Sequence, residues 1–98
     1  MNTPKQLRNG IDRLTYHILA ALDAHDRELS LVYLVSLVTS NAREEGNSYT
    51  CEEVRVRVSS LGYSLYALIN VRFDNSCVFV SLSSYGIKAL ASHYKSIA

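Results

Sequence analysis

The sequence predicts an α+β fold in which three helices are followed by a β-hairpin and a final helix. Apolar residues between positions 11 and 22 recur every three or four positions, which is the spacing of one helical stripe. Two apolar, β-rich runs, 65–73 and 77–82, are joined by the short polar segment 74–76, a pattern typical of a hairpin. A second helical stripe occupies 87–97 and predicts a helix at the end of the chain.

The size and composition fit one modest domain. The chain has 98 residues, 48% hydrophobic and 19% charged, with a single Pro, as in compact globular proteins. We assign residues 11–98 to this domain and residues 1–10, which contain an Asn-Gly turn, to an N-terminal arm. The longest apolar run, 29–38, is shorter than the roughly 20 residues of a membrane-spanning helix, and the N-terminus lacks the apolar core of a secretory signal. We therefore expect a cytoplasmic protein.

The first half of the chain predicts two helices. The first runs from about 12 to 24 and is followed by a polar break at 25–28. Ser30 is a plausible N-cap for a second helix through about residue 40, although the many β-branched residues in this segment also permit a strand. Residues 41–49 are polar and include a Gly-Asn pair, so we expect a loop.

Residues 50–62 are the most informative segment. Thr50 followed by Glu53 is a capping-box pattern, and Gly62 could supply a left-handed terminator. On a helical wheel Val54 and Val58 lie on one face, which favours a helix with these valines in the core. The alternation of valine with arginine along 53–58 would equally suit a strand, and that alternative stays open.

The order of elements and three short segments resemble the winged helix-turn-helix transcriptional regulators. The segments are 18–22 (ILAAL), 61–63 (LGY) and 82–86 (LSSYG), the last similar to the Leu-Thr-x-x-Gly start of the final helix in that family. The resemblance covers about residues 11–97. The chain departs from the pattern in having Ser83 in place of the usual Thr and little positive charge on the helix at 50–62.

This resemblance implies double-stranded DNA as the partner. The helix at 50–62 would enter the major groove, while the hairpin tip would reach a neighbouring minor groove or phosphates. Arg55 is then the first candidate for a base or phosphate contact, and Arg57 the second. The other candidates are polar residues of the helix, the hairpin and the arm: Tyr49, Thr50, Ser59, Ser60, Arg72, Asn75, Ser76, Lys5 and Arg8.

Two alternatives to these contacts stay open. Arg55 and Arg57 could instead pair locally with Glu52 and Glu53 on a solvated face, and the hairpin could be a plain turn. The net charge is only +1, although the half from residue 47 onward has five basic and three acidic residues. DNA-binding domains usually show a clearer basic excess. A second hypothesis is therefore a small winged-helix or α+β protein-interaction module, such as a viral or accessory factor, without DNA binding.

The final helix predicts self-association. Its apolar stripe could pair with a two-fold copy, as the terminal helices of similar regulators often do, or could simply cover the core of its own domain. The stripe consists of Ile87, Leu90, Ala91, Tyr94 and Ile97.

Catalysis and metal binding find little support in the sequence. His17, His25 and His93 and the two cysteines, Cys51 and Cys77, are not at the spacing of a metal site, and no motif links a nucleophile to a base. We expect neither an enzyme nor a cofactor, and two reduced, mostly buried thiols.

Overall fold

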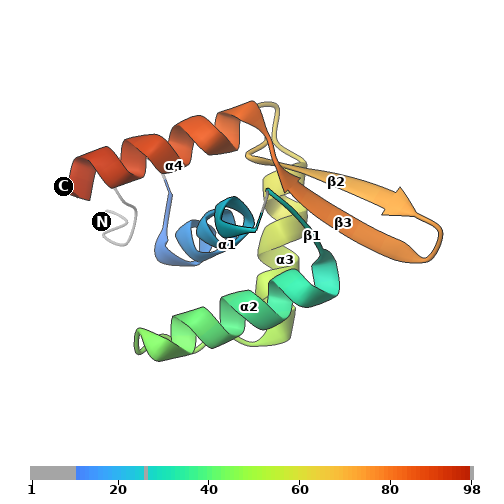
Figure 1. The fold of residues 1–98 in the computed structure, drawn as a ribbon, viewed down its shortest axis with the longest axis horizontal. Helices are drawn as coiled ribbons and strands as arrows, with labels where there is room; N and C mark the ends of the chain where they lie inside the picture. Colours follow the sequence, from blue (N-terminus) through green and yellow to red (C-terminus); the bar gives the residue numbers. More distant parts are fainter. Residues whose placement is uncertain (1–10, 26, 98) are drawn as a thin grey trace, which may run out of the picture.

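The structure, a computed structural model, describes residues 11–25 and 27–97 and has the predicted order of elements with one added strand. These residues form four helices and a three-stranded antiparallel sheet in the strand order β1-β3-β2 (Figure 1). The elements in chain order are α1 (Arg13–Ala24), β1 (Glu28–Ser30), α2 (Leu31–Glu44), α3 (Cys51–Gly62), β2 (Ile69–Asp74), β3 (Cys77–Leu82) and α4 (Ser84–Ile97).

Helix α1 is the centre of the packing. Asp12 caps it, since its Oδ1 accepts a hydrogen bond from the backbone N–H of Thr15 at 2.9 Å. Ile18, Leu19 and Leu22 of the predicted stripe are fully buried. The helix contacts α2, α3, α4 and the sheet, so the apolar stripe read from the sequence does become the core.

The strand β1 and the length of α2 differ from the prediction. Glu28–Ser30 pairs antiparallel with β3, Leu29 opposite Val80, whereas the sequence predicted a polar break at 25–28 followed directly by the cap of the second helix, with no strand. Three residues with exposed or half-buried side chains carry no periodic signal, so only the presence of β3 beside them makes a strand. Ser30 caps α2 as expected, but the helix continues to Glu44 rather than ending near residue 40, and the loop that follows is correspondingly short.

Residues 51–62 form a helix, as predicted, and the strand alternative is wrong. Val54 and Val58 are buried while Val56 is 58% exposed, which is helical and not strand spacing. Gly62, however, is the last residue of α3 and does not act as a left-handed terminator, because its φ is not positive. The C-cap residue that follows, Tyr63, has an ordinary right-handed backbone. A side chain on Gly62 would lie 3.2 Å from the Val71 side chain, so this glycine lets the end of α3 approach β2.

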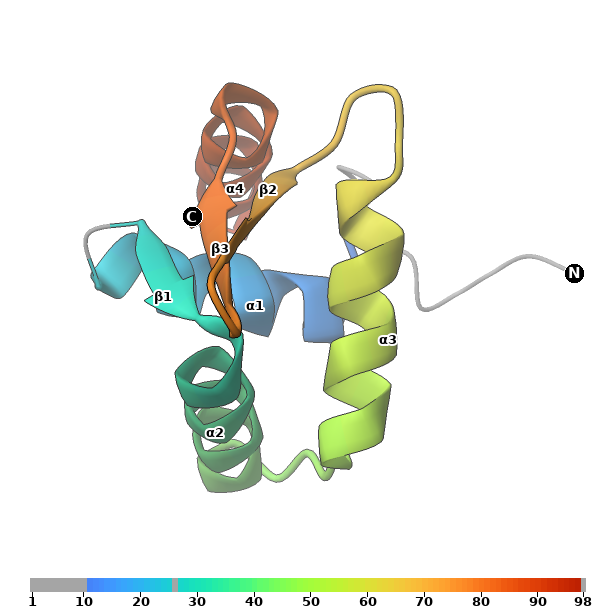
Figure 2. The same ribbon diagram turned by 90° about the vertical axis from the view of Figure 1, so that its right-hand side faces the viewer.

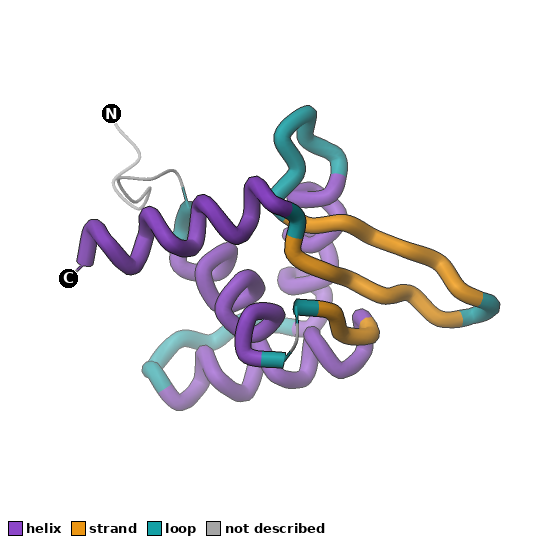
Figure 3. The backbone as a smooth tube through the Cα atoms, turned by 45° about the horizontal axis from the view of Figure 1, so that its top comes forward, coloured by secondary structure: helices purple, strands orange, loops and turns teal. Residues whose placement is uncertain are grey.

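The hairpin forms as predicted but its first strand is shorter. Strand β2 begins at Ile69 and pairs with β3 from Ile69 opposite Leu82 to Asp74 opposite Cys77. The backbone of the preceding residues is held elsewhere: the Ser83 hydroxyl donates to the carbonyl of Ala67 at 2.6 Å. Residues 63–68 therefore form a loop between α3 and the sheet, and Figure 3 shows the hairpin projecting well beyond the helices.

The start of α4 follows the prediction, and the cysteines do not. Ser83 accepts a hydrogen bond from the backbone N–H of Gly86 at 3.0 Å, which is N-cap geometry. Cys51 and Cys77 are both exposed, so the expectation of buried thiols is wrong. Cys51 lies in the first turn of α3, and Cys77 lies next to the hairpin turn, opposite Asp74. Within the described ranges, no helix is long and apolar enough to cross a membrane.

Candidate nucleic-acid interface

An exposed helix and a projecting hairpin lie next to each other on this molecule. In Figure 2, α3 runs along the right side of the body, with α2 at the lower left across from its lower half and the hairpin near the centre of the view. The outer face of α3 carries exposed Glu52, Arg55, Val56, Ser59 and Ser60. Because the end of α3 meets Val71 of β2, helix and hairpin form one continuous surface.

The start of α3 is firmly built. Thr50 Oγ1 accepts from the backbone N–H of Glu53 at 3.0 Å, and Glu53 accepts from the backbone N–H of Thr50 at 2.8 Å, so the predicted capping box is complete. Tyr49 is half-buried against the core, with its ring 6.4 Å from that of His17. The capping box satisfies backbone groups at the start of α3, and Tyr49 joins the segment before the helix to the core.

Arg55 is the arginine that α3 presents to solvent. Its side chain is half exposed, and its Nη2 lies 3.8 Å from Oε1 of Glu52, one turn earlier. A pair this long and this exposed contributes well under about 1 kcal/mol to stability. The local pairing that the sequence left open therefore exists for Arg55, and it is weak enough for the guanidinium to change partners.

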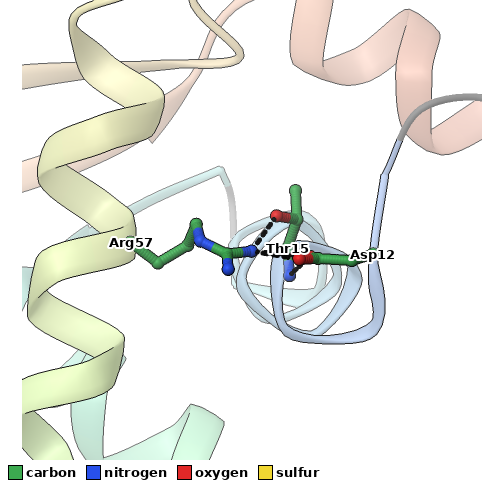
Figure 4. Close-up of polar contacts among 3 residues, drawn as sticks. All are labelled: Asp12, Thr15 and Arg57. Atoms are coloured by element: carbon green, nitrogen blue, oxygen red, sulfur yellow. Dashed lines mark hydrogen bonds and ion pairs between the residues drawn. The ribbon is translucent and has the colours of Figure 1, made fainter. Parts of the chain in front are cut away.

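Arg57 turns inward and joins α3 to α1 (Figure 4). Its Nη1 donates to Oδ1 of Asp12 at 2.6 Å and to the Thr15 hydroxyl at 2.9 Å. Burial alone would raise the pKa of Asp12, but the hydrogen bonds from Arg57 and Thr15 outweigh it, and the pKa lies below its ordinary value. Arg57 thus pairs with neither Glu52 nor Glu53, and the ion pair with Asp12 occupies the guanidinium that we predicted as the second DNA contact.

Arg72, the arginine of the hairpin, is held by two carboxylates. Its Nη2 lies 3.4 Å from Glu28 of β1 and its Nη1 3.5 Å from Asp74, and the guanidinium sits 4.6 Å from the centre of the Phe79 ring. The hydrogen bond and the negative charge of Glu28 raise the pKa of Arg72. Arg72 therefore lies over the ring of its cross-strand partner Phe79, and its pair with Glu28 depends on the strand β1.

The turn of the hairpin exposes its remaining polar candidates. Asn75 has a left-handed backbone, with φ of 56°, and both Asn75 and Ser76 are exposed. Phe73, beside the turn, is 76% exposed. The helical wheel predicts the outward position of Val56, whereas no sequence signal distinguishes Phe73 from the other apolar residues of the hairpin. Lys5 and Arg8, the candidates from the arm, lie outside the described residues.

The residues predicted for self-association are divided between the core and the surface. Leu90 is 3% exposed and Ile87 is half-buried against the core, so α4 uses them to cover its own domain. Ala91 is exposed and Tyr94 is 43% exposed, its ring 6.2 Å from that of Tyr16. The side chain of Ile97 lies outside the described set. Ala91 and Tyr94 are thus the members of the stripe that α4 leaves accessible.

Among the described residues, no group of three or more His, Cys, Asp and Glu side chains could hold a metal ion. His17 is buried, with its Nε2 3.6 Å from Glu45, and desolvation lowers its pKa despite the raising effect of Glu45.

Comparison with known proteins rests on structure alone. No family model and no curated protein matches the sequence. F93 from STIV, described as a winged-helix DNA-binding protein, superposes with a TM-score of 0.69 at 15% identity, over 84% of each chain. This chain has the winged-helix fold. A structure of BpsR from Bordetella bronchiseptica, from work on the regulation of its DNA binding by 6-hydroxynicotinic acid, superposes with a TM-score of 0.72 at 18% identity.

In this winged-helix fold α3 is the third helix of the helical part, and the β2–β3 hairpin that follows it stands in the place of the wing. The match to BpsR covers 95% of this chain and 64% of the BpsR chain, so this chain spans less than two thirds of that protein. The fold that the sequence predicted is confirmed.

Proposed function

We propose that this chain is a DNA-binding transcriptional regulator that inserts α3 into the major groove of double-stranded DNA. The observation that carries the proposal is the exposed outer face of α3 beside a projecting hairpin, in a fold shared with two proteins described as binding DNA. Arg55 makes the main contact, and Ser59 and Ser60 add neutral hydrogen bonds. The cytoplasmic location predicted from the sequence, and the absence of an enzymatic role, belong to this proposal.

The wing supplies a second contact. Asn75 and Ser76 at its tip, with Arg72, would reach phosphates next to the groove that holds α3. Arg72 must loosen its pairs with Glu28 and Asp74 to do so. Glu52 and Glu53 at the start of α3 repel DNA phosphates, so few positive charges of the domain contact the DNA. Lys5 and Arg8 of the arm would add positive charge to the interface.

Charge counting gives the expected salt dependence. If Arg55 and Arg72 are the described cations that reach phosphates, the slope of log affinity against log salt should be roughly −2 per copy. A slope several times steeper would mean that the arm or other cations carry the binding instead.

Titration with duplex DNA tests this function directly. Fluorescence anisotropy with a mixed-sequence duplex, repeated at low and moderate salt, should show binding that weakens as salt rises. Arg55→Ala should weaken binding by about tenfold or more, and Lys95→Ala, which removes an exposed cation from the last turn of α4, should leave it unchanged. No binding at low salt, or binding indifferent to salt, would refute the proposal.

One observation favours a second function, a protein-interaction module without DNA binding. Of the arginines predicted to contact DNA, the three in the described part of the chain each have a carboxylate within ion-pair distance: Glu52 for Arg55, Asp12 for Arg57, and Glu28 and Asp74 for Arg72. Such pairing lowers the positive potential of the surface. Failure of the DNA titration in a folded protein would favour this function.

Self-association as a homodimer also belongs to the proposal, because regulators that bind two half-sites do so with two-fold symmetry. The α4 stripe supports it with the exposed side chains of Ala91 and Tyr94 alone, since Leu90 packs inside the domain.

A further inference from the structure

The loop between α3 and β2 displays the most exposed aromatic and aliphatic side chains near one another on the described molecule. Tyr63 is 88% exposed, Leu65 86% and Tyr66 61%, and the Tyr66 ring lies 5.1 Å from that of Tyr85, which is 45% exposed on the first turn of α4. We refer to these four side chains as the tyrosine patch. Figures 2 and 3 show the loop standing at the C-terminal end of α3, close to the start of α4.

Hydrogen bonds hold the end of this loop, at Ala67 and Leu68, against the start of α4, which carries Tyr85. Ser83 donates from its hydroxyl to the carbonyl of Ala67 at 2.6 Å and from its backbone N–H to the carbonyl of Leu68 at 3.1 Å. Gly86 completes this contact, since a Cβ there would lie 2.1 Å from the Leu68 carbonyl oxygen.

The surroundings of the patch carry no charge in the sequence. No Asp, Glu, Lys or Arg occurs between Arg57 and Arg72, nor between Asp74 and Lys88. A DNA phosphate or a strongly charged protein would find no complementary group here, whereas a second neutral, aromatic surface would meet no electrostatic penalty. A two-fold contact offers such a surface, because it brings the same patch from each copy together.

The size of the patch is sufficient for a weak dimer. With about 200 Å² for a whole tyrosine and somewhat less for leucine, the exposed parts of the four side chains amount to about 500 Å². If a second copy covered these parts completely, the two copies would together bury at most about 1,000 Å², which is the lower limit for a specific interface. The pairing would therefore depend on protein concentration.

We propose that the tyrosine patch, rather than the α4 stripe, pairs this chain with a second copy of itself. The patch lies at the opposite end of α3 from Thr50, so the pairing leaves the leading end of the helix and the hairpin tip uncovered in both copies. The proposal does not depend on DNA binding. A chain that pairs without binding DNA would uphold it and overturn the proposed function.

Sedimentation of the protein alone, over a wide range of concentration, tests the proposal. The wild type should pass from monomer to dimer, and the double variant Tyr63→Ser/Leu65→Ser should raise the dissociation constant by about tenfold or more. The matched control is Val32→Ser/Tyr33→Ser, which removes another exposed aliphatic and aromatic pair, 82% and 49% exposed, from the start of α2. The control should dimerise like the wild type.

Opposite charges placed at position 65 of two copies test whether the patch pairs with itself. Leu65→Lys and Leu65→Glu should each weaken the dimer through repulsion between like charges, and an equimolar mixture of the two should sediment as a heterodimer. Because the side chain is almost wholly exposed, neither variant should lose its fold, and far-UV circular dichroism checks this. A mixture as monomeric as its components would count against pairing of the patch with itself.

Three other outcomes would overturn the proposal. The first is a wild type that stays monomeric throughout, including one whose patch binds a different protein. The second is equal loss of dimer in the Val32→Ser/Tyr33→Ser control. The third is dissociation by Tyr94→Glu while Tyr63→Ser/Leu65→Ser still dimerises, which would return the interface to α4.

Discussion

Replacing Arg57 by alanine should destabilise the protein, although Arg57 lies on the helix proposed to bind DNA. The guanidinium donates to the carboxylate of Asp12 and to the Thr15 hydroxyl and joins the middle of α3 to the start of α1. A hydrogen-bonded ion pair can contribute up to about 3 kcal/mol, but both side chains are about a third exposed, so we expect a loss of about 1–2 kcal/mol. For a domain of this size that lowers the melting temperature by about 5–10 °C.

Arg55→Ala is the matched control on the same helix. Its pair with Glu52 is 3.8 Å long and exposed, so the free energy of unfolding should change by less than about 0.5 kcal/mol. Thermal and urea unfolding followed by circular dichroism measure both variants, and the anisotropy titration measures their DNA affinity. Arg57→Ala should lose stability more than affinity, and Arg55→Ala affinity alone.

A double-mutant cycle isolates the contact. Asp12→Ala removes the cap of α1 as well as the ion pair, and the cap contributes about 1 kcal/mol. In the Arg57→Ala background the same change should cost only the cap, which leaves a coupling energy of about 1 kcal/mol. If Arg57→Ala melts like the wild type, or the coupling is zero, the structural role assigned to Arg57 is wrong.

The remaining predictions concern the core, a buried histidine and a close backbone contact. Val58→Asp should destabilise by more than about 3 kcal/mol because it buries a carboxylate, and Val56→Asp by less than about 0.5 kcal/mol in urea unfolding; equal losses would contradict the helix. Burial lowers the pKa of His17, so the unfolded chain binds the proton first and stability should fall as the pH drops below about 6.5. His17→Gln should remove this part of the pH dependence of the melting temperature, and an unchanged slope would assign it to other groups. Gly86→Ala should lower the melting temperature by at least several degrees, since the Cβ would overlap the Leu68 carbonyl oxygen; a wild-type melting temperature would contradict that contact.

The interface shows how far sequence reasoning reaches. Arg55 was found because the wheel places it on the flank of a helix whose buried face, Val54 and Val58, is clear from spacing. Arg57 was assigned to DNA from the same wheel, which contains no information on Asp12, 45 positions away. Arg72 was placed on the hairpin correctly, but its partner Glu28 belongs to a strand that exists only because β3 lies beside it.

Local chemistry therefore determined most of the fold from the sequence alone. The helical periodicity and the polar turn of the hairpin depend on residues a few positions apart. The same holds for the capping box at Thr50 and Glu53 and for the Ser83 cap, so both partners of each interaction lie within one short segment of sequence. The winged-helix order of elements followed from these signals.

Only the tertiary structure decided which surfaces are free. Leu90 entered the core, Arg57 was drawn to Asp12, both cysteines became exposed, and the loop after α3 raised Tyr63 and Leu65 into solvent. In each case the outcome depends on whether residues far away in the sequence pack against the side chain, among the residues that the structure describes. Burial and ion pairing depend on distances in space that no local pattern of residues encodes.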